Sequence, residues 1–347
     1  MGDNTIAAVR QQNQSSLHYE KDIGLAELDG FQLPSDVTEE FLERMQKEVT
    51  ILEMADTMTL DRLEQEVPQF GVPQLSGHAR AEETTRTTNS AADSGFVKFN
   101  ATDKSYYILV EPKRDALKNT HYGPDQFGDY IIDEFVQRWG NDIGLIGIRA
   151  GASSDNLQSI GGAAELDSTW NGWIAIAEGS DTASDRIGLE NTASTELDTM
   201  PTVDMAGSAI DTKMFDDTIT ELDSRFRDPD DTVFICSPDQ VQAYTMGLTQ
   251  REDPLGSAVI FGDSEITPFD YDVVGVNGWP NSYAMFTNPD NLAYGLFENM
   301  ELDQTTDTDT VHENRLHSRN WLEGQFDFQV KELQAGVLVQ NIADPTA

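Results

Sequence analysis

Two histidines and a glutamate are the first candidates for chemistry. His312, Glu313 and His317 come close to the zinc-protease pattern, in which two histidines of one helix bind the metal and the glutamate is the general base. These histidines are five residues apart instead of four, so they do not share a helical face, and on a strand they point to opposite sides. The spacing therefore predicts no metal site.

Other reactive residues are equally poor candidates. Asp303, Asp307 and Asp309 lack the glycine and the terminal glutamate of a calcium loop, which favours a solvated acidic loop. Cys236 ends the apolar run VFIC, so we expect a buried small hydrophobe and not a nucleophile. The sequence has no phosphate loop, dinucleotide fingerprint or nucleophile elbow. The lack of these motifs shifts the expectation from an enzyme towards a structural protein without a cofactor.

The charge of the chain is extreme. Asp and Glu number 62 against 22 Lys and Arg, which gives a net charge of −40. Such self-repulsion is tolerable where molar salt shortens the Debye length to about 3 Å. The composition favours a protein of a salt-saturated cytoplasm, with an acidic mesophilic protein as the alternative. Nucleic-acid binding through a basic patch is not expected.

Targeting signals are not recognisable. Residues 1–14 lack the basic and apolar regions of a signal peptide, and no window approaches eighteen apolar residues. The single cysteine cannot form an intrachain disulfide. We expect a soluble protein without a membrane-spanning segment.

The first third of the chain alternates between polar and periodic stretches. Residues 1–34 predict an extended arm without a core of its own. A helix is expected from Ser35 or Asp36 to about Val67, before two prolines. Residues 76–111 predict a long two-stranded hairpin with little apolar surface at its tip. Such a hairpin is not stable alone, so it needs a neighbour.

The strongest helical pattern follows Gly123 and Pro124. Apolar residues recur at steps of four and then three, which predicts one apolar face over residues 124–150. We expect this helix to form part of a core through Phe127, Ile131, Phe135, Trp139 and Ile143.

The second half of the chain predicts a mixed sheet and then antiparallel strands. A helix around 215–226, a buried strand at 232–236 and a helix from Pro238 capped by Ser237 indicate a small mixed sheet covered by helices. Further on, strands at 283–287 and 292–302 are expected to flank a turn. Alternation then predicts a strand through 326–331.

This order of elements resembles the major capsid protein of tailed viruses, the Hong Kong 97 fold, over residues 35–343. The stretches that carry the resemblance are "MFDDTITELDSRFRDPDDTVFICSPDQVQAYTMGLTQREDPLGSAVIFG", "PFDYDVVGVNGWPNSYAMFTNPDNLAYGLFENMELD" and "RNWLEGQFDFQVKELQAGVLVQNI". It implies an α+β fold with these parts: an N-terminal arm (1–34), a helix leading into the peripheral domain (35–75), an extended loop (76–111), a peripheral domain with a spine helix at 124–150 (112–204), an axial domain (205–278) and peripheral strands (279–347).

The resemblance implies contact sites between subunits instead of a catalytic site. The extended loop would lie on a neighbouring subunit, with contacts at Arg80, Arg86, Phe96, Lys98 and Phe99. A loop at 247–262 would approach the capsomer axis with Gln250, Arg251, Asp253 and Leu255. Some relatives join subunits covalently through a lysine and an asparagine, for which Lys98, Lys104 and Asn288 are the candidates here.

The resemblance also implies the function. The chain would form hexamers and pentamers of an icosahedral shell around double-stranded DNA, without sequence-specific binding, in the virion of a tailed virus of a halophilic archaeon. Assembly would take place in the host cytoplasm. Because no scaffolding segment is recognised, a separate scaffolding protein is expected, with a portal and decoration proteins as further partners. The alternatives are an encapsulin-like nanocompartment shell and a haloadapted soluble hydrolase.

Overall fold

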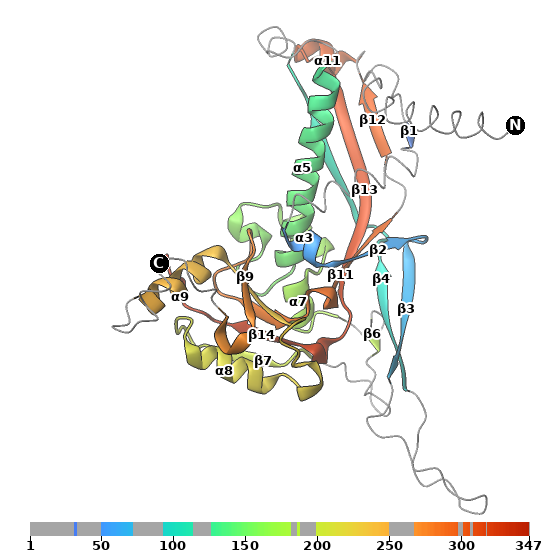
Figure 1. Ribbon diagram of the computed structural model, residues 1–347. Coiled ribbons are helices and arrows are strands. Elements are labelled where there is room, and N and C mark those ends of the chain that lie inside the picture. The colour runs from blue at the N-terminus through green and yellow to red at the C-terminus, as the bar shows by residue number, and fades with distance from the viewer. Residues whose placement is uncertain are drawn as a thin grey trace, which may run out of the picture. The chain divides into compact units, whose positions relative to one another are not determined.

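The computed structural model combines helices with three sheets (Figure 1). It describes residues 31–32, 50–71, 93–113, 126–181, 186–187, 199–249, 267–297, 301–305, 308–316 and 318–346. The chain divides into two compact units, of which unit 1 comprises Met1–Val49, Ser105–Asp142 and Phe297–Gln325, and unit 2 comprises Thr50–Lys104, Ile143–Leu296 and Phe326–Ala347. Helix α5 (Gln126–Arg149) and strand β13 (Arg319–Val330) each have residues assigned to unit 1 and residues assigned to unit 2.

Unit 1 contains an antiparallel sheet with one buried and one exposed face. In the sheet β12 and β5 both pair with the first half of β13, and β1 pairs with β12. Along β5, Ile108 is buried and the preceding Tyr107 is 54% exposed, as expected for a strand covered on one side. The bounds in this unit are β1 (Phe31–Gln32), β5 (Ser105–Val110), β12 (Glu301–Thr305) and α11 (Asp309–Glu313).

Unit 2 is built around a five-stranded mixed sheet in the order β7-β14-β10-β8-β9. The outer pairs are parallel and the inner pairs antiparallel. Helices α8 and α9 pack beside this sheet (Figure 1). The elements are β7 (Thr202–Asp204), α8 (Thr212–Glu221), β8 (Val233–Cys236), α9 (Pro238–Thr249), β9 (Asp272–Gly275), β10 (Ala284–Thr287) and β14 (Gly336–Gln340).

Aromatic rings fill the core of this sheet. Phe234 and Phe286 are stacked with centroids 4.1 Å apart, and Phe215 meets Phe234 edge-on at 4.7 Å. Cys236 is 2% exposed beside them, and burial raises the pKa of its thiol to about 12. The prediction that Cys236 is a buried hydrophobe is confirmed.

The rest of unit 2 holds short helices and two further groups of strands. Strand β11 pairs with the second half of β13 and with β2, while β3, β4 and β6 form a separate three-stranded sheet. The bounds are α3 (Thr50–Met54), β2 (Asp56–Leu60), β3 (Glu64–Gly71), β4 (Asp93–Asn100), η2 (Leu157–Ile160), α6 (Ala164–Thr169), α7 (Trp173–Ala177), β6 (Arg186–Ile187), η3 (Ser224–Phe226), η4 (Pro268–Asp270), η5 (Pro289–Asn291), β11 (Leu292–Phe297) and η6 (Leu333–Ala335).

The first predicted helix ends much earlier than expected. Helix α3 ends at Met54 and the chain continues as β2 and β3, so the prediction that a helix runs to about Val67 is wrong. Leu60 of β2 is fully buried and lies against Gly295 of β11, where an added Cβ would come within 2.9 Å of the leucine. Pairing with distant strands therefore overrides the local helical period.

The strands within the predicted hairpin of 76–111 pair with other parts of the chain. Residues 93–100 pair with 64–71, whereas Ser105–Val110 pairs with β13. The run from Phe96 to Val110 is broken by a turn in which Lys104 N–H donates to the Ala101 carbonyl at 3.2 Å and Asp103 has a φ of 61°. One β-prone stretch of sequence thus supplies strands to two sheets.

The turn expected across residues 288–291 is confirmed, but the strands that flank it do not pair with each other as a hairpin. Pro289–Asn291 forms a 3-10 turn capped by Asn288, but β10 and β11 enter different sheets. The mixed sheet takes β7, β10 and β14 from outside the predicted axial domain of 205–278. Local predictions hold: α5 spans Gln126–Arg149, and Ser237 caps α9 by accepting from the Gln240 N–H at 3.2 Å.

Candidate assembly surfaces

The ribbon formed by β3 and β4 has two unlike faces. Gln65 stands opposite Phe99 and Val67 opposite Val97, so these side chains share one face. Phe99 and Val97 are 1% and 2% exposed. A Cβ at Gly295 would lie 2.9 Å from the Phe99 ring, so this face packs closely on the chain's own core. The described end of the ribbon is therefore part of the folded unit.

A buried arginine fixes the third strand beside the ribbon. The Arg186 side chain is 3% exposed, and its Nε donates to Asp181 Oδ2 at 2.9 Å. Its other nitrogens donate to Gln329 Oε1 at 3.2 Å and to the carbonyl oxygens of Val330 and Lys331. Gln329 Nε2 in turn donates to the Lys98 carbonyl at 3.1 Å. The charge is thus compensated, as buried ions require.

A second buried charge holds the turn after β4. Asp327 is only 2% exposed, and its carboxylate accepts from the Asn100 N–H at 2.7 Å and from Lys104 Nζ at 2.6 Å. Burial raises the pKa of Asp327, while the charge of Lys104 acts in the opposite direction. The two contacts join β13 to the base of the ribbon.

Replacing Lys104 by Met is expected to destabilise the fold by about 3–5 kcal/mol near neutral pH, because a buried carboxylate loses its cation. In the unfolded chain the Asp327 carboxyl has a pKa of about 3.9, and in the folded protein its pKa is raised. The loss of unfolding free energy therefore grows as the pH rises and the carboxyl ionises, and it shrinks as the pH falls to about 4. Urea unfolding at several pH values measures this. Lys213→Met, at a side chain that is 77% exposed, is the matched control and should change stability little. An equal loss in both variants would contradict the argument.

The outward face of the ribbon is accessible. Glu66 stands opposite Lys98, and Lys98 Nζ forms an ion pair with Glu64 at 2.9 Å. Beyond these charges Pro68 is exposed and stands opposite the half-buried Phe96. A shallow hollow adjoins this face and is lined by Asp61, Arg62, Glu64, Gln65, Glu66 and Lys98. Charges and a small apolar patch thus lie together on one exposed face.

The predicted contact residues fall into three groups. Phe96 and Lys98 lie on the outward face, whereas Phe99 lies in the core of its own chain because the register turns it inward. Phe99 is therefore corrected from a surface contact to a core residue. The remaining predicted contacts lie outside the described residues: Arg80, Arg86, Gln250, Arg251, Asp253 and Leu255.

Two of the five predicted core residues of the spine helix have side chains that the structure describes. Trp139 and Ile143 are fully buried. The Trp139 ring meets the Tyr106 ring of β5 edge-on, with centroids 5.4 Å apart. The residues Phe127, Ile131 and Phe135 belong to α5, but their side chains lie outside the described part of the structure.

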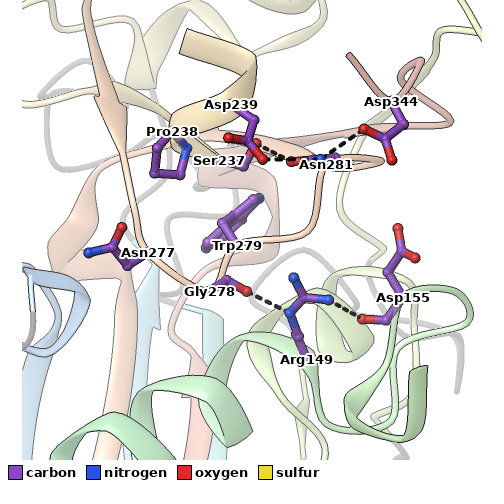
Figure 2. Close-up of a pocket in the computed structure, with 10 residues that line it drawn as sticks. All are labelled: Arg149, Asp155, Ser237, Pro238, Asp239, Asn277, Gly278, Trp279, Asn281 and Asp344. Carbon is purple, nitrogen blue, oxygen red and sulfur yellow. Dashed lines mark hydrogen bonds between the residues drawn. The ribbon is translucent and has the colours of Figure 1, made fainter. Parts of the chain in front are cut away.

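A polar pocket in unit 2 lies between the end of α5, the start of α9 and the loop before β10 (Figure 2). Arg149 donates to the carbonyls of Gly278 at 2.5 Å and Asp155 at 2.9 Å, and burial lowers the pKa of its guanidinium. Asn281 accepts from Ser237 at 2.6 Å and donates to Asp344 at 2.9 Å. These hydrogen bonds connect separate segments of the chain. The residues that form them do not place a nucleophile beside a general base.

In the part of the chain that the structure describes, no three His, Cys, Asp or Glu side chains are grouped so that they could bind a metal. His317 of the zinc-like pattern lies outside that part. None of the helices described is both long and apolar enough to cross a bilayer.

No protein-family model and no curated protein matches the sequence. Solved structures do match. A chain of the satellite phage P4 procapsid, solved with the size determination (Sid) protein, aligns over 99% of this chain and 98% of its own, with 13% identity and a TM-score of 0.59. This chain has the Hong Kong 97 capsid fold. The capsid of a native GTA particle covers 85% of this chain and 91% of its own, with 11% identity and a TM-score of 0.57.

The Hong Kong 97 fold confirms the predicted fold class. A third similar structure is the capsid of cyanophage A-1(L), which covers 82% of this chain and 90% of its own, with 13% identity and a TM-score of 0.53. Helix α5 lies within residues 124–150, where a long helix was predicted, and β4 lies within residues 76–111.

Proposed function

We propose that this chain is the major capsid protein of a tailed virus. Copies would assemble as hexamers and pentamers into an icosahedral shell that encloses double-stranded DNA, and the protein would reside in the virion. The observation that carries the proposal is the end-to-end correspondence with a procapsid chain, over 99% of one chain and 98% of the other. Two capsid structures from other particles support it.

The ribbon supports a role between copies. Its inward face is fixed by Phe99, and its outward face leaves Phe96 and Lys98 accessible. We propose that this face and the extended loop, with Arg80 and Arg86, contact a neighbouring copy. The loop that holds Gln250, Arg251, Asp253 and Leu255 would face the capsomer axis. A separate scaffolding protein, a portal and decoration proteins are the proposed partners.

Electron microscopy of the purified protein in molar salt tests the function. Closed shells are expected, and particles recovered from infected cells should contain double-stranded DNA. Shells that enclose an enzyme would favour the nanocompartment alternative. A monomer under all salt conditions, with hydrolytic activity, would favour the hydrolase and overturn the proposal.

Adaptation to high salt and a halophilic archaeal host form the finer part of the proposal. The net charge of −40 supports it, because every contact between copies brings like charges together. Lowering the salt from about 1 M to about 0.1 M lengthens the Debye length from about 3 Å to about 10 Å. We expect shells to dissociate on this dilution, as measured by light scattering. Shells that stay intact would contradict the adaptation and leave the capsid function standing.

A further inference from the structure

The chain contains two Asn-Gly pairs, Asn171–Gly172 and Asn277–Gly278, and each is followed by a tryptophan. Asparagine before glycine is prone to spontaneous deamidation, because glycine has no side chain to hinder attack by its own backbone nitrogen on the asparagine amide. The two pairs have the same local sequence, Asn-Gly-Trp, so an unfolded chain should deamidate both at similar rates. A difference between them in the folded protein must therefore come from the fold.

The first pair is held in place at its backbone. The Gly172 N–H donates to the Ala150 carbonyl at 2.8 Å. Gly172 is buried, and an added Cβ would lie 2.7 Å from the Gly147 carbonyl oxygen and 2.8 Å from that of Ile146, both in α5. The nitrogen that would attack Asn171 is thus hydrogen-bonded and packed on the helix backbone. Deamidation there requires local opening of this contact.

The second pair has free reacting groups. Asn277 and Gly278 are the central residues of a turn, which the Trp279 N–H closes on the Val276 carbonyl at 3.2 Å. Asn277 is exposed and lines the polar pocket (Figure 2). Within the described part of the chain, neither its side chain nor the Gly278 N–H takes part in a hydrogen bond. The two groups can therefore meet through rotations inside one exposed turn.

The glycine of the second pair is required by the fold. Gly278 has a φ of 85°, which the third position of such a turn demands and which favours glycine. An added Cβ would also lie 2.6 Å from Leu145 Cδ2. Its carbonyl accepts from Arg149 Nε at 2.5 Å. A test of the pair must therefore change Asn277 and leave Gly278 in place.

We propose that Asn277 is a site of spontaneous deamidation in the folded protein. The Gly278 nitrogen attacks Asn277 Cγ and forms a new C–N bond, the Cγ–Nδ2 bond breaks, and ammonia leaves with the proton of the attacking nitrogen. Water then opens the resulting succinimide at one of its two carbonyls, which yields aspartate or isoaspartate. Water is the only co-reactant, and no oxidant or reductant takes part.

The modification changes the pocket in two ways. Each conversion adds a negative charge to a pocket that Asp155, Asp239 and Asp344 already line. Isoaspartate also adds a methylene to the main chain directly before Gly278, whose carbonyl Arg149 holds. The modification does not depend on the proposed shell function.

The test follows both Asn-Gly pairs in one sample of the purified wild-type protein. The folded protein is incubated in molar salt at mildly alkaline pH, where base promotes attack by the amide nitrogen, and is digested at acidic pH, where deamidation is slow. Peptide mass spectrometry measures conversion of amide to acid, and labelling by protein isoaspartyl methyltransferase detects isoaspartate. We expect Asn277 to convert at least about tenfold faster than Asn171, because Asn171 reacts only through local opening.

Asn277→Gln is the matched variant, because a longer side chain disfavours the five-membered ring and an exposed position tolerates the change. It should lose the isoaspartate label at residue 277 and leave the conversion of Asn171 unchanged. In urea the wild type should convert both asparagines at similar rates. Equal rates in the folded protein would overturn the proposal, as would conversion of Asn277 that occurs only in urea.

Discussion

Replacing residues 72–92 by a two-residue Asn-Gly turn is expected to leave a folded subunit that forms no closed shells. Gly71 and Asp93 are register partners at the described end of the ribbon, so a short hairpin turn can join them. Val97 and Phe99 stay in place and keep the inward face packed. A wider deletion over 78–103 would remove both residues and damage the subunit itself.

The excision is measured by two readouts. A thermal melt followed by far-UV circular dichroism should match the wild type within a few degrees, and electron microscopy in molar salt should show no closed particles. A Gly-Ser segment of unchanged length in place of 72–92 is the control for chain length. If that control also fails to assemble, the side chains of the loop provide the contact. Closed shells from the excised chain would rule out an essential role between copies.

Elements with strong local signals were predictable from the sequence. Helix α5 has a long apolar stripe, and α9 has a serine cap followed by proline at its first position. Residues 56–71 lack such a signal, because their apolar residues also fit a helical period. What decides their conformation is pairing with β11 and β4, which are distant in sequence.

The buried polar residues of β13 show why the candidate surface was only partly predictable. Asp327 and Gln329 alternate with Phe326 and Phe328, a pattern typical of a strand with one face in water. Both polar residues are buried, at 2% and 4% exposure, because the base of the ribbon covers that face. Their partners Lys104 and Arg186 lie far away in the sequence. Local alternation carries no information about such a covering element.

Trp139→Ala is expected to destabilise the fold by about 3–5 kcal/mol, because it removes a large, fully buried side chain and leaves a cavity. The variant also loses the edge-on contact of the indole with Tyr106. Domains of this kind are stable by about 5–15 kcal/mol, so a loss of this size lowers the soluble yield and reduces assembly together. Urea unfolding of the dissociated subunit measures the loss directly.

Tyr107→Ala is the matched control. Tyr107 is also an aromatic residue and follows Tyr106 in β5, but it is 54% exposed. It stacks on Trp321 with centroids 4.2 Å apart, so its removal should cost only about 0.5–1.5 kcal/mol. Trp139→Phe keeps most of the buried volume and should fall between the two variants. If the stripe on α5 instead lined a ligand pocket, Trp139→Ala would remove a binding activity and spare both folding and assembly. An unchanged unfolding free energy with intact particles would therefore show that Trp139 is not a core residue, since a buried indole of this size cannot be removed without cost.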